Sequence, residues 1–367
     1  MARFKKLLVI SSIAAIAMNS IIGAMLVMQP VWFARYSEIP ATNRTPPLIT
    51  GSFIQYTGLG SWNYTMWATE FTNLEAVGID TLIIQWVHDS ATNNTLYQSS
   101  IFGFESSVVS PDMKVPWPND QHFPEVSDVL NVLFNLAELH NMSIHIGLTI
   151  AWDFWEDVAN STWIIEEAAL NHRLATELLQ KYGNLSSFGG FYIPYEMHQA
   201  SDAAGADGTV YGTFFGSIAA AIRAAEQEVL GNTDKVISTA PYVSPVGWIP
   251  HVLDFWNQFL SRAGVDVLMI QDGVGVHRLD TARDVPVNYA VVTEACSTNN
   301  VTFWTDLEIF EIEGFIPASF SRVQPQLEIE CKYVEKIIVF DIPHYLSLQY
   351  SPAAAVLYQA YDAFLTE

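Results

Sequence analysis

The chain has 367 residues, of which 50% are hydrophobic and 13% aromatic, so it can bury one sizeable core. Its 39 acidic residues outweigh 16 basic ones and give a net charge of -23. Such a negative surface repels phosphate backbones and anionic lipid, which argues against nucleic-acid partners and peripheral membrane binding. An uncharged ligand is the natural expectation, although the same charge would also aid solubility in a salty or acidic medium.

The first 35 residues predict a signal anchor or a signal peptide. A basic stretch at residues 3–6 precedes an apolar run over residues 7–33. This run could span about 30 Å of hydrocarbon, which favours an uncleaved anchor with its positive end in the cytoplasm. Cleavage after Ala17 is the alternative and would yield a secreted protein. We therefore expect an extracytoplasmic protein, either single-pass with a lumenal or extracellular barrel, or secreted.

Two further features bear on export. Sequons for N-glycosylation follow the apolar run and have meaning only in a secretory context. They begin at Asn43, Asn63, Asn93, Asn141, Asn160, Asn184 and Asn300. In an oxidising compartment Cys296 and Cys331 could form one disulfide, and two buried free thiols are the alternative.

After a linker over residues 36–48, apolar β-rich runs alternate with segments of helical period, which is typical of βα units around a parallel sheet. The predicted strands cover residues 49–56, 81–88, 144–151, 189–195, 236–242, 267–271, 301–307 and 336–342. The predicted helices cover residues 66–77, 126–140, 163–181, 211–230, 252–263, 281–296, 322–334 and 352–365. Helix ends are marked by glycines that suit a left-handed residue, namely Gly78, Gly183, Gly231 and Gly264.

Eight βα units in succession, without an interdomain linker, predict an α/β fold of the (β/α)8 TIM-barrel type over residues 49–367. An open, doubly wound sheet is the alternative. The proline-rich segment 89–125 is too long for an ordinary connection, so we interpret it as a lid or a wall of the substrate site.

Two carboxylates at predicted strand ends give the sharpest hypothesis about chemistry, because TIM-barrel active sites lie at the C-terminal ends of the strands. Glu196 closes the fourth strand and Glu308 closes the seventh, where Trp304, Asp306 and Glu308 share one face. These strands lie across the barrel from each other, so the two glutamates can face one another over a bound sugar. Glycoside hydrolysis needs one carboxylic acid to protonate the leaving oxygen and one carboxylate to attack the sugar or activate water.

This placement resembles clan A of the retaining glycoside hydrolases. The resemblance implies that Glu196 is the acid/base and Glu308 the nucleophile. The sequence departs from the clan at the position before the acid/base, where Tyr195 replaces the usual Asn.

Other polar and aromatic residues near the strand ends are expected to bind substrate. They are Gln55, Gln85, Trp86, Trp152, Tyr195, Tyr242, Gln271, Asp272 and Asp306. Flat aromatic rings suit the apolar faces of sugars, although core packing explains any single aromatic equally well. Neither a phosphate-binding glycine loop nor a His-rich ligand set is present in the sequence, so we expect no cofactor and no metal.

The region from residue 49 to 365 also resembles a poorly characterised family of glycosyl-hydrolase-like TIM barrels, classified as a domain of unknown function. The matching blocks, in chain order, are GSFIQ at 51–55, GIDTLIIQW at 78–86, GFYIPYE at 190–196, QDGVG at 271–275 and DLE at 306–308. The first hypothesis is therefore an extracytoplasmic glycoside hydrolase acting on an oligo- or polysaccharide. The alternative is a catalytically inactive barrel that binds carbohydrate or acts in adhesion.

Overall fold

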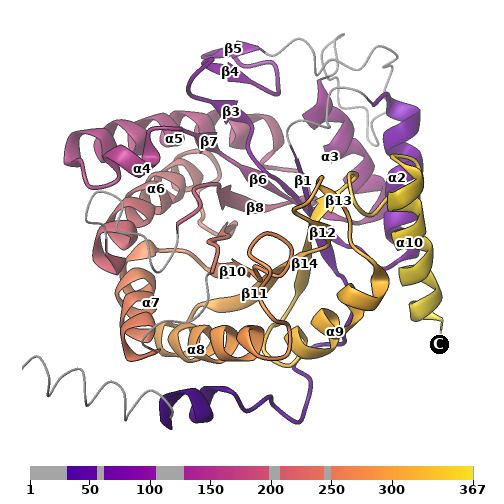
Figure 1. Cartoon of the computed structure of the whole chain (residues 1–367). Coiled ribbons are helices and arrows are strands. Elements are labelled where there is room, and N and C mark those ends of the chain that lie inside the picture. The colour runs from indigo at the N-terminus through magenta and orange to yellow at the C-terminus, as the bar shows by residue number, and fades with distance from the viewer. Residues whose placement is uncertain (1–30, 56–61, 105–127, 198–206, 244–248, 367) are drawn as a thin grey trace, which may run out of the picture.

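A closed barrel of parallel strands forms the centre of the protein (Figure 1). The computed structural model describes residues 31–55, 62–104, 128–197, 207–243 and 249–366. Around the barrel the strands are β1 (Gly51–Ile54), β14 (Ile337–Ile342), β11 (Thr302–Glu308), β10 (Val267–Gln271), β9 (Val236–Thr239), β8 (Phe188–Ile193), β6 (Ser143–Gly147) and β2 (Thr81–Ile84). The predicted barrel is confirmed, and the open sheet is excluded because each of these eight strands pairs with two neighbours and the first strand, β1, pairs with the last, β14.

Helices surround the barrel, as Figure 1 shows. They are α2 (Tyr64–Ala76), α3 (Val129–His140), α4 (Phe154–Asp157), α5 (Ser161–Tyr182), α6 (Gly208–Val229), α7 (Ile249–Ala263), α8 (Asp284–Asn299), α9 (Phe320–Glu330) and α10 (Pro352–Leu365). All the long helices correspond to predicted ones, with ends displaced by a few residues. The short helix α4 lies in the connection after β6 and was not predicted.

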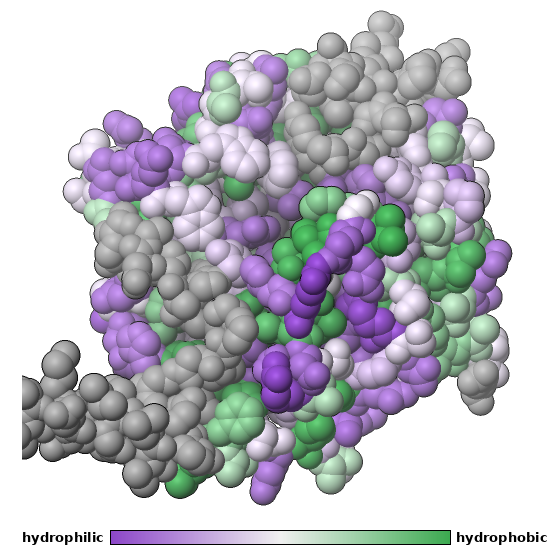
Figure 2. Space-filling model, in the orientation of Figure 1, coloured by the Kyte–Doolittle hydropathy of each residue, from purple (hydrophilic) through white to green (hydrophobic). Residues whose placement is uncertain are grey.

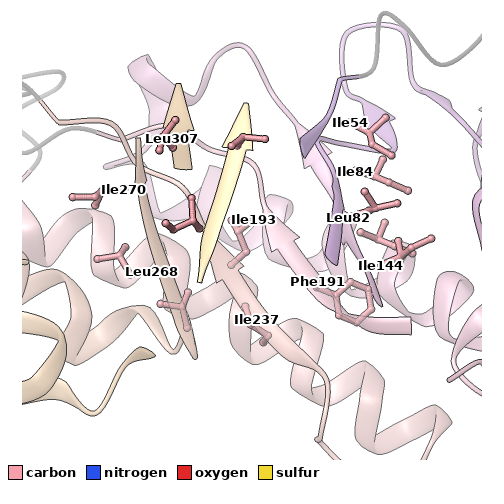
Figure 3. Close-up of a cluster of buried hydrophobic side chains, with 14 of the residues drawn as sticks. Ile54, Leu82, Ile84, Ile144, Phe191, Ile193, Ile237, Leu268, Ile270 and Leu307 are labelled. Atoms are coloured by element: carbon pink, nitrogen blue, oxygen red, sulfur yellow. The ribbon is translucent and has the colours of Figure 1, made fainter. Parts of the chain in front are cut away.

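The alternation of side chains along each strand divides the apolar residues into two layers. Outward-facing residues such as Ile84, Phe191 and Leu268 pack between the strands and the helices (Figure 3). Inward-facing residues such as Phe53 and Met269 fill the lower barrel. Because side chains fill the inside of the barrel, it is a core rather than a pore.

Helix boundaries follow from capping side chains. The amide oxygens of Asn63 and Asn160 accept hydrogen bonds from the backbone at the starts of α2 and α5, which therefore begin earlier than predicted. Gly78 has the predicted left-handed φ of 82°. Gly183 does not, since its φ is -58°. A Cβ there would lie 2.5 Å from the Leu179 carbonyl oxygen, so close packing rather than chain reversal requires this glycine.

Two small sheets lie at the C-terminal end of the barrel. One consists of β5 (Gly103–Phe104), β4 (Asn94–Thr95), β3 (His88–Asp89) and β7 (Thr149–Ile150). It contains the described part of the predicted lid, and the remainder, residues 105–127, lies outside the described residues. The other is the hairpin of β12 (Phe310–Glu311) and β13 (Ile316–Pro317), which follows β11 directly.

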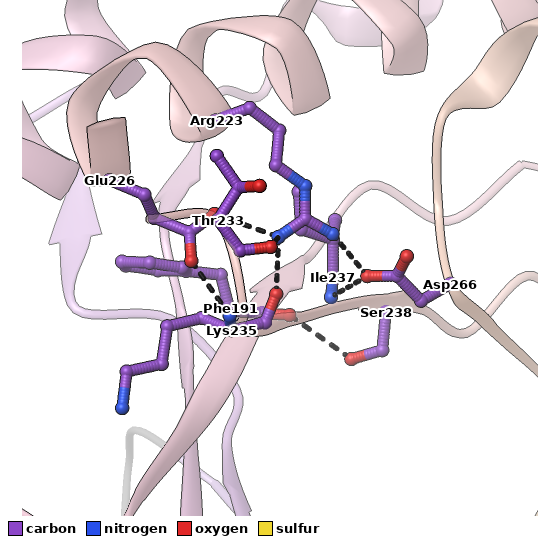
Figure 4. Close-up of polar contacts among 8 residues, drawn as sticks. All are labelled: Phe191, Arg223, Glu226, Thr233, Lys235, Ile237, Ser238 and Asp266. Carbon is purple, nitrogen blue, oxygen red and sulfur yellow. Dashed lines mark hydrogen bonds and ion pairs between the residues drawn. The ribbon is translucent and has the colours of Figure 1, made fainter. Parts of the chain in front are cut away.

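A polar cluster closes the opposite end of the barrel between α6 and β9 (Figure 4). Arg223 donates to Glu226 at 2.7 Å and to the backbone carbonyl of Thr233 at 3.2 Å, and it also pairs with Asp266. Glu226 in turn accepts from the Lys235 backbone N–H at 2.7 Å. The fully buried Glu226 carboxylate thus has both a cation and a backbone donor, which is the condition for burying a charge.

The predicted localisation as a single-pass membrane protein needs correction. Within the part of the chain that the structure describes, no helix has both the length and the apolar character to cross a membrane. The predicted anchor at residues 7–33 lies largely outside the described residues. The predicted linker packs on the barrel, since the Arg44 backbone N–H donates to the carbonyl of Cys331 at 2.9 Å. Cys331 and Cys296 are both buried free thiols, the second of the two alternatives.

Candidate active site

A cavity of about 260 Å³ opens at the C-terminal ends of the barrel strands. Its lining combines carboxyl groups, carboxamides and aromatic rings, namely Phe53, Gln55, Gln85, Tyr192, Glu196, Gln271, Val276, Asp306, Glu308, Phe310, Phe315 and Phe340. Figure 2, in the orientation of Figure 1, shows hydrophilic and apolar surface side by side near the barrel centre. The cavity therefore offers both hydrogen-bonding groups and flat apolar surface to one ligand.

Strand alternation places the two predicted carboxyl groups in this cavity. On β11, Trp304 belongs to the core inside the barrel, whereas Leu307 packs outward against the helices. Asp306 and Glu308 have the same parity as Trp304 and line the cavity above it. Glu196 follows the end of β8 and reaches the cavity from across the barrel.

Glu308 is buried and fixed by backbone donors. Its Oε2 accepts a hydrogen bond from the Val276 N–H at 2.7 Å, and the Gly275 N–H also stabilises the charged form. Burial and, next, the negative charge of Asp272 raise the pKa of Glu308 to about 8. The loop after β10 thus holds the Glu308 carboxyl in one orientation, while its neighbours favour the retention of a proton.

Glu196 is exposed to solvent and lines the cavity from the end of β8. The protein around it displaces part of its water and raises its pKa above the usual range of a glutamate, and a hydrogen bond with the Gln271 side chain opposes the change. Gln271 is itself oriented, because its Nε2 donates to the Ala240 carbonyl at 3.0 Å. A carboxyl group with a raised pKa beside an open cavity suits a general acid.

Asp306 lies deepest of the three acids. It is buried, and its Oδ1 has no hydrogen-bond partner among the described residues. Burial, followed by the charges of Glu308 and Asp272, raises the pKa of Asp306 far above its usual range. A neutral Asp306 can donate a hydrogen bond into the cavity, as a substrate hydroxyl would require.

Asp272 lies behind Glu308 and lines neither this cavity nor its neighbour. Its Oδ1 accepts from the Val274 N–H at 2.9 Å, and its Oδ2 accepts from Gln326 of α9. Burial and, next, the charge of Asp272 raise the pKa of Glu330 well above its usual range, so a protonated Glu330 donates a hydrogen bond to the Asp272 carboxylate. Burial also raises the pKa of Asp272 itself, and the hydrogen bonds with Val274 and Glu330 oppose that rise. In its ionised form Asp272 acts on Glu308 through its charge, without lining the cavity.

The remaining predicted binding residues fall into two groups. Gln55 and Gln85 line the first cavity, and Gln85 also lines a second cavity with Trp86, Trp152 and Tyr195. The Tyr195 ring is buried, and its hydroxyl donates to Glu167 of α5 at 2.9 Å. Tyr242 lines neither cavity and packs against His277 at 5.5 Å between ring centroids.

The hairpin after β11 supplies residues that the sequence analysis missed. Phe310 and Phe315 line the first cavity and stack on each other with ring centroids 6.2 Å apart. The only sequence signal for them was their position in a βα loop, directly after the predicted seventh strand. The described residues contain no group of three or more His, Cys, Asp or Glu side chains placed to hold a metal ion.

The fold and the site define a TIM-barrel protein with an acidic, aromatic-lined cavity at the C-terminal strand ends. The chain belongs to the family described as Domain of unknown function (DUF4434), whose model matches residues 49–356. The family resemblance seen in the sequence is thereby confirmed. None of the curated proteins matches the chain significantly.

Several solved structures share the fold at low sequence identity. A predicted alpha-L-fucosidase from Bacteroides thetaiotaomicron is 20% identical, with a TM-score of 0.67 over 90% of this chain and 98% of that one. An endo-1,4-beta-D-mannanase from Thermotoga petrophila is 12% identical, with a TM-score of 0.54 over 86% and 100% of the two chains. An endo-1,4-beta-mannanase from Rhizomucor miehei is 10% identical, with a TM-score of 0.54 over 90% and 99%.

Proposed function

We propose that this chain is a glycoside hydrolase that cleaves O-glycosidic bonds with retention of configuration, with Glu308 as nucleophile and Glu196 as acid and base. The observation that carries the proposal is that both carboxyl groups line one cavity, from the ends of β11 and β8. The mannanases that share the fold act on glycosidic bonds by their names, which supports a carbohydrate substrate. The catalytically inactive binding barrel is the alternative outcome of the test below.

The proposed reaction has two steps. First, the Glu308 carboxylate attacks C1 of the sugar while the bond from C1 to the leaving oxygen breaks, and Glu196 gives its proton to that oxygen. Second, Glu196 removes a proton from water, the water oxygen attacks C1, and the bond from C1 to Glu308 breaks. The first step needs ionised Glu308 and protonated Glu196. Burial and the charge of Asp272 raise the pKa of Glu308 to about 8 and the backbone donors oppose that rise, so the nucleophile forms as the pH approaches 8; the pKa of Glu196 is also raised, as an acid requires.

Neutral hydrogen-bonding groups complete the proposed site. The protonated Asp306 is a donor, and the carboxamides of Gln55 and Gln85 can each donate and accept. Sugar hydroxyls need both donors and acceptors, whereas a charged metabolite would need a counter-charge. The cavity lining among the described residues contains no Lys or Arg, so an uncharged sugar ring is the ligand that fits.

We propose that the protein acts outside the cytoplasm in a secreted form, supported by the apolar run at residues 7–33, interpreted as a cleavable signal, and by the sequons that follow it. The test is expression of the full chain in a eukaryotic secretory host. Treatment with peptide N-glycosidase should lower the apparent mass of the product. Export without any such mass change would refute glycosylation, and failure to enter the secretory route would refute the proposed location.

Hydrolysis of a glycan panel tests the proposed activity. Wild type, Glu196→Gln and Glu308→Gln should be compared with Glu328→Gln, which changes an exposed glutamate on α9. We expect wild type and Glu328→Gln to cleave the same glycan, and both site variants to lose at least about 1,000-fold in kcat while melting like wild type. Binding of glycans without cleavage by any of the proteins would favour the inactive barrel instead.

A further inference from the structure

A second cavity, of about 190 Å³, adjoins the first on the side of β2, β6 and β8. Its lining is largely aromatic, namely Gln85, Trp86, Ile150, Ala151, Trp152, Phe154, Trp155, Pro194, Tyr195 and Glu196. Gln85 and Glu196 line both cavities, and Glu308 lines only the first. The two cavities therefore meet at the proposed acid, while the proposed nucleophile lies wholly on one side.

This asymmetry fixes the direction in which a substrate must lie. The atom attacked is C1, so the sugar that is transferred must occupy the cavity that contains Glu308. The leaving oxygen must meet the proton of Glu196, and the group attached to that oxygen must continue beyond Glu196. We propose that the second cavity binds the leaving-group sugar of an uncharged oligosaccharide, an inference that rests on the proposed hydrolase function.

The aromatic residues of the second cavity suit a sugar ring. Trp152 is 66% exposed, which is unusual for so large an apolar side chain and leaves its surface open to a ligand. Its ring meets that of Trp86 edge to face, with centroids 6.4 Å apart and planes at 84°. Trp155 packs edge to face on the buried Phe154, with ring centroids 5.1 Å apart. These aromatic side chains give the second cavity apolar surface of the kind that packs on a sugar ring.

The charge of the second cavity selects against anionic leaving groups. Glu196 is the only acidic residue in the described lining, and that lining contains no Lys, Arg or His. A uronic acid or a phosphorylated sugar would find no counter-charge here and would approach a carboxyl group in a strongly acidic protein. A neutral pyranose needs only the apolar rings and the Gln85 carboxamide.

The test compares two substrates that share the transferred sugar. One is the shortest cleaved member of a panel of manno-, gluco-, xylo- and chito-oligosaccharides, and the other is the matching glycosyl fluoride, whose leaving group has no ring. The full chain is assayed as wild type, Trp152→Ala and Trp152→Phe. Val356→Ala on α10 is the control, because Val356 is also 66% exposed and lies outside both cavities.

We expect Trp152→Ala to lower kcat/KM for the oligosaccharide about tenfold and to change it less than about twofold for the fluoride. Trp152→Phe should restore most of the loss, and Val356→Ala should behave like wild type. Replacing the leaving sugar by its uronic acid should also lower kcat/KM about tenfold.

Equal effects of Trp152→Ala on both substrates would overturn the leaving-group assignment while leaving the hydrolase proposal intact. Cleavage of the uronic acid substrate as fast as the neutral one would overturn the assignment to an uncharged sugar. If wild type cleaves no oligosaccharide of the panel and no glycosyl fluoride, the proposed function itself fails, and the inference fails with it.

Discussion

The charge of Asp272 should control the pH dependence of the reaction through Glu308. Both carboxylates bind the loop that follows β10. Asp272 accepts a hydrogen bond from the backbone N–H of Val274, and Glu308 accepts one from the backbone N–H of Val276. The two donors are two residues apart and therefore at most about 7 Å from each other, and we take about 7 Å as the order of magnitude of the separation between the two carboxylates. Two unit charges at about 7 Å interact by about 2.4 kcal/mol at an effective dielectric constant of about 20, equivalent to about 1.7 pKa units. Asp272→Asn should therefore lower the pKa of Glu308 by about 1 to 2.

The assay is the pH profile of kcat/KM on a cleaved glycan. Ionised Glu308 is the nucleophile, so activity rises with pH on the acidic limb as Glu308 loses its proton. The negative charge of Asp272 opposes that loss, and its removal should move the acidic limb to lower pH by about 1 to 2. Asp362→Asn, on the exposed face of α10, is the control and should leave the limb in place.

An unchanged acidic limb in a folded Asp272→Asn variant would refute this reasoning. Melting curves separate the effect of the lost charge from a loss of folded structure, which is a concern because Asp272 is also a buried hydrogen-bonding group. Asn retains the acceptor for the Val274 N–H, so the change in charge can be isolated from gross loss of structure.

Two further predictions concern stability. Burial raises the pKa of Glu70 to about 7, so folding favours its protonated form and the stability it contributes is lost as pH rises from about 4.5 to 7. The free energy of unfolding of Glu70→Gln, measured with denaturant, should rise by about 3 kcal/mol relative to that of wild type between pH 4.5 and pH 8. If the free energies of unfolding of the two proteins change with pH in parallel, this prediction is contradicted. Arg223→Met should cost about 3 to 5 kcal/mol because it leaves the Glu226 carboxylate buried without its cation, whereas Arg262→Met, at an exposed position, should cost less than about 1. Equal losses in these two arginine variants would rule out a special role for the buried pair.

The barrel could be predicted because the sequence patterns that define its strands and helices are local. Apolar runs with β-rich composition, separated by segments of helical period, define each βα unit within a few residues. Helix starts shifted where a polar side chain caps the backbone, as Asn160 does at α5. Gly183 was misinterpreted because a glycine needed for close packing and one needed for a left-handed turn look identical in sequence.

Strand parity also placed Glu196 and Glu308 near the site in advance, since alternation carries over from the last residues of β8 and β11. Beyond the end of a strand, this alternation no longer predicts the direction in which a side chain points. Asp272 follows β10 directly, but its carboxyl group points to Gln326 of α9 and not into the cavity. The hairpin that brings Phe315 over the cavity depends on tertiary contacts, which no periodicity reveals.

The asparagines of the sequons can be explained in two ways, as glycosylation sites or as residues that suit the ends of helices. Asn63 caps a helix start, whereas Asn141 and Asn300 take left-handed conformations with φ of 53° and 55° at helix ends. Asn is favoured at both kinds of position for backbone reasons alone. The structural roles of these residues therefore account for their identity whether or not the chain is glycosylated.

Covalent trapping tests the central claim most directly. The full chain is incubated with the 2-deoxy-2-fluoroglycosyl fluoride of the sugar it transfers, and intact mass and peptide mapping follow. The account predicts that the mass rises by one fluoroglycosyl unit, attached to Glu308, and that Glu308→Gln gains none. An adduct on another residue, or continued turnover of the natural glycan without any adduct, would contradict the assignment of Glu308 as the nucleophile.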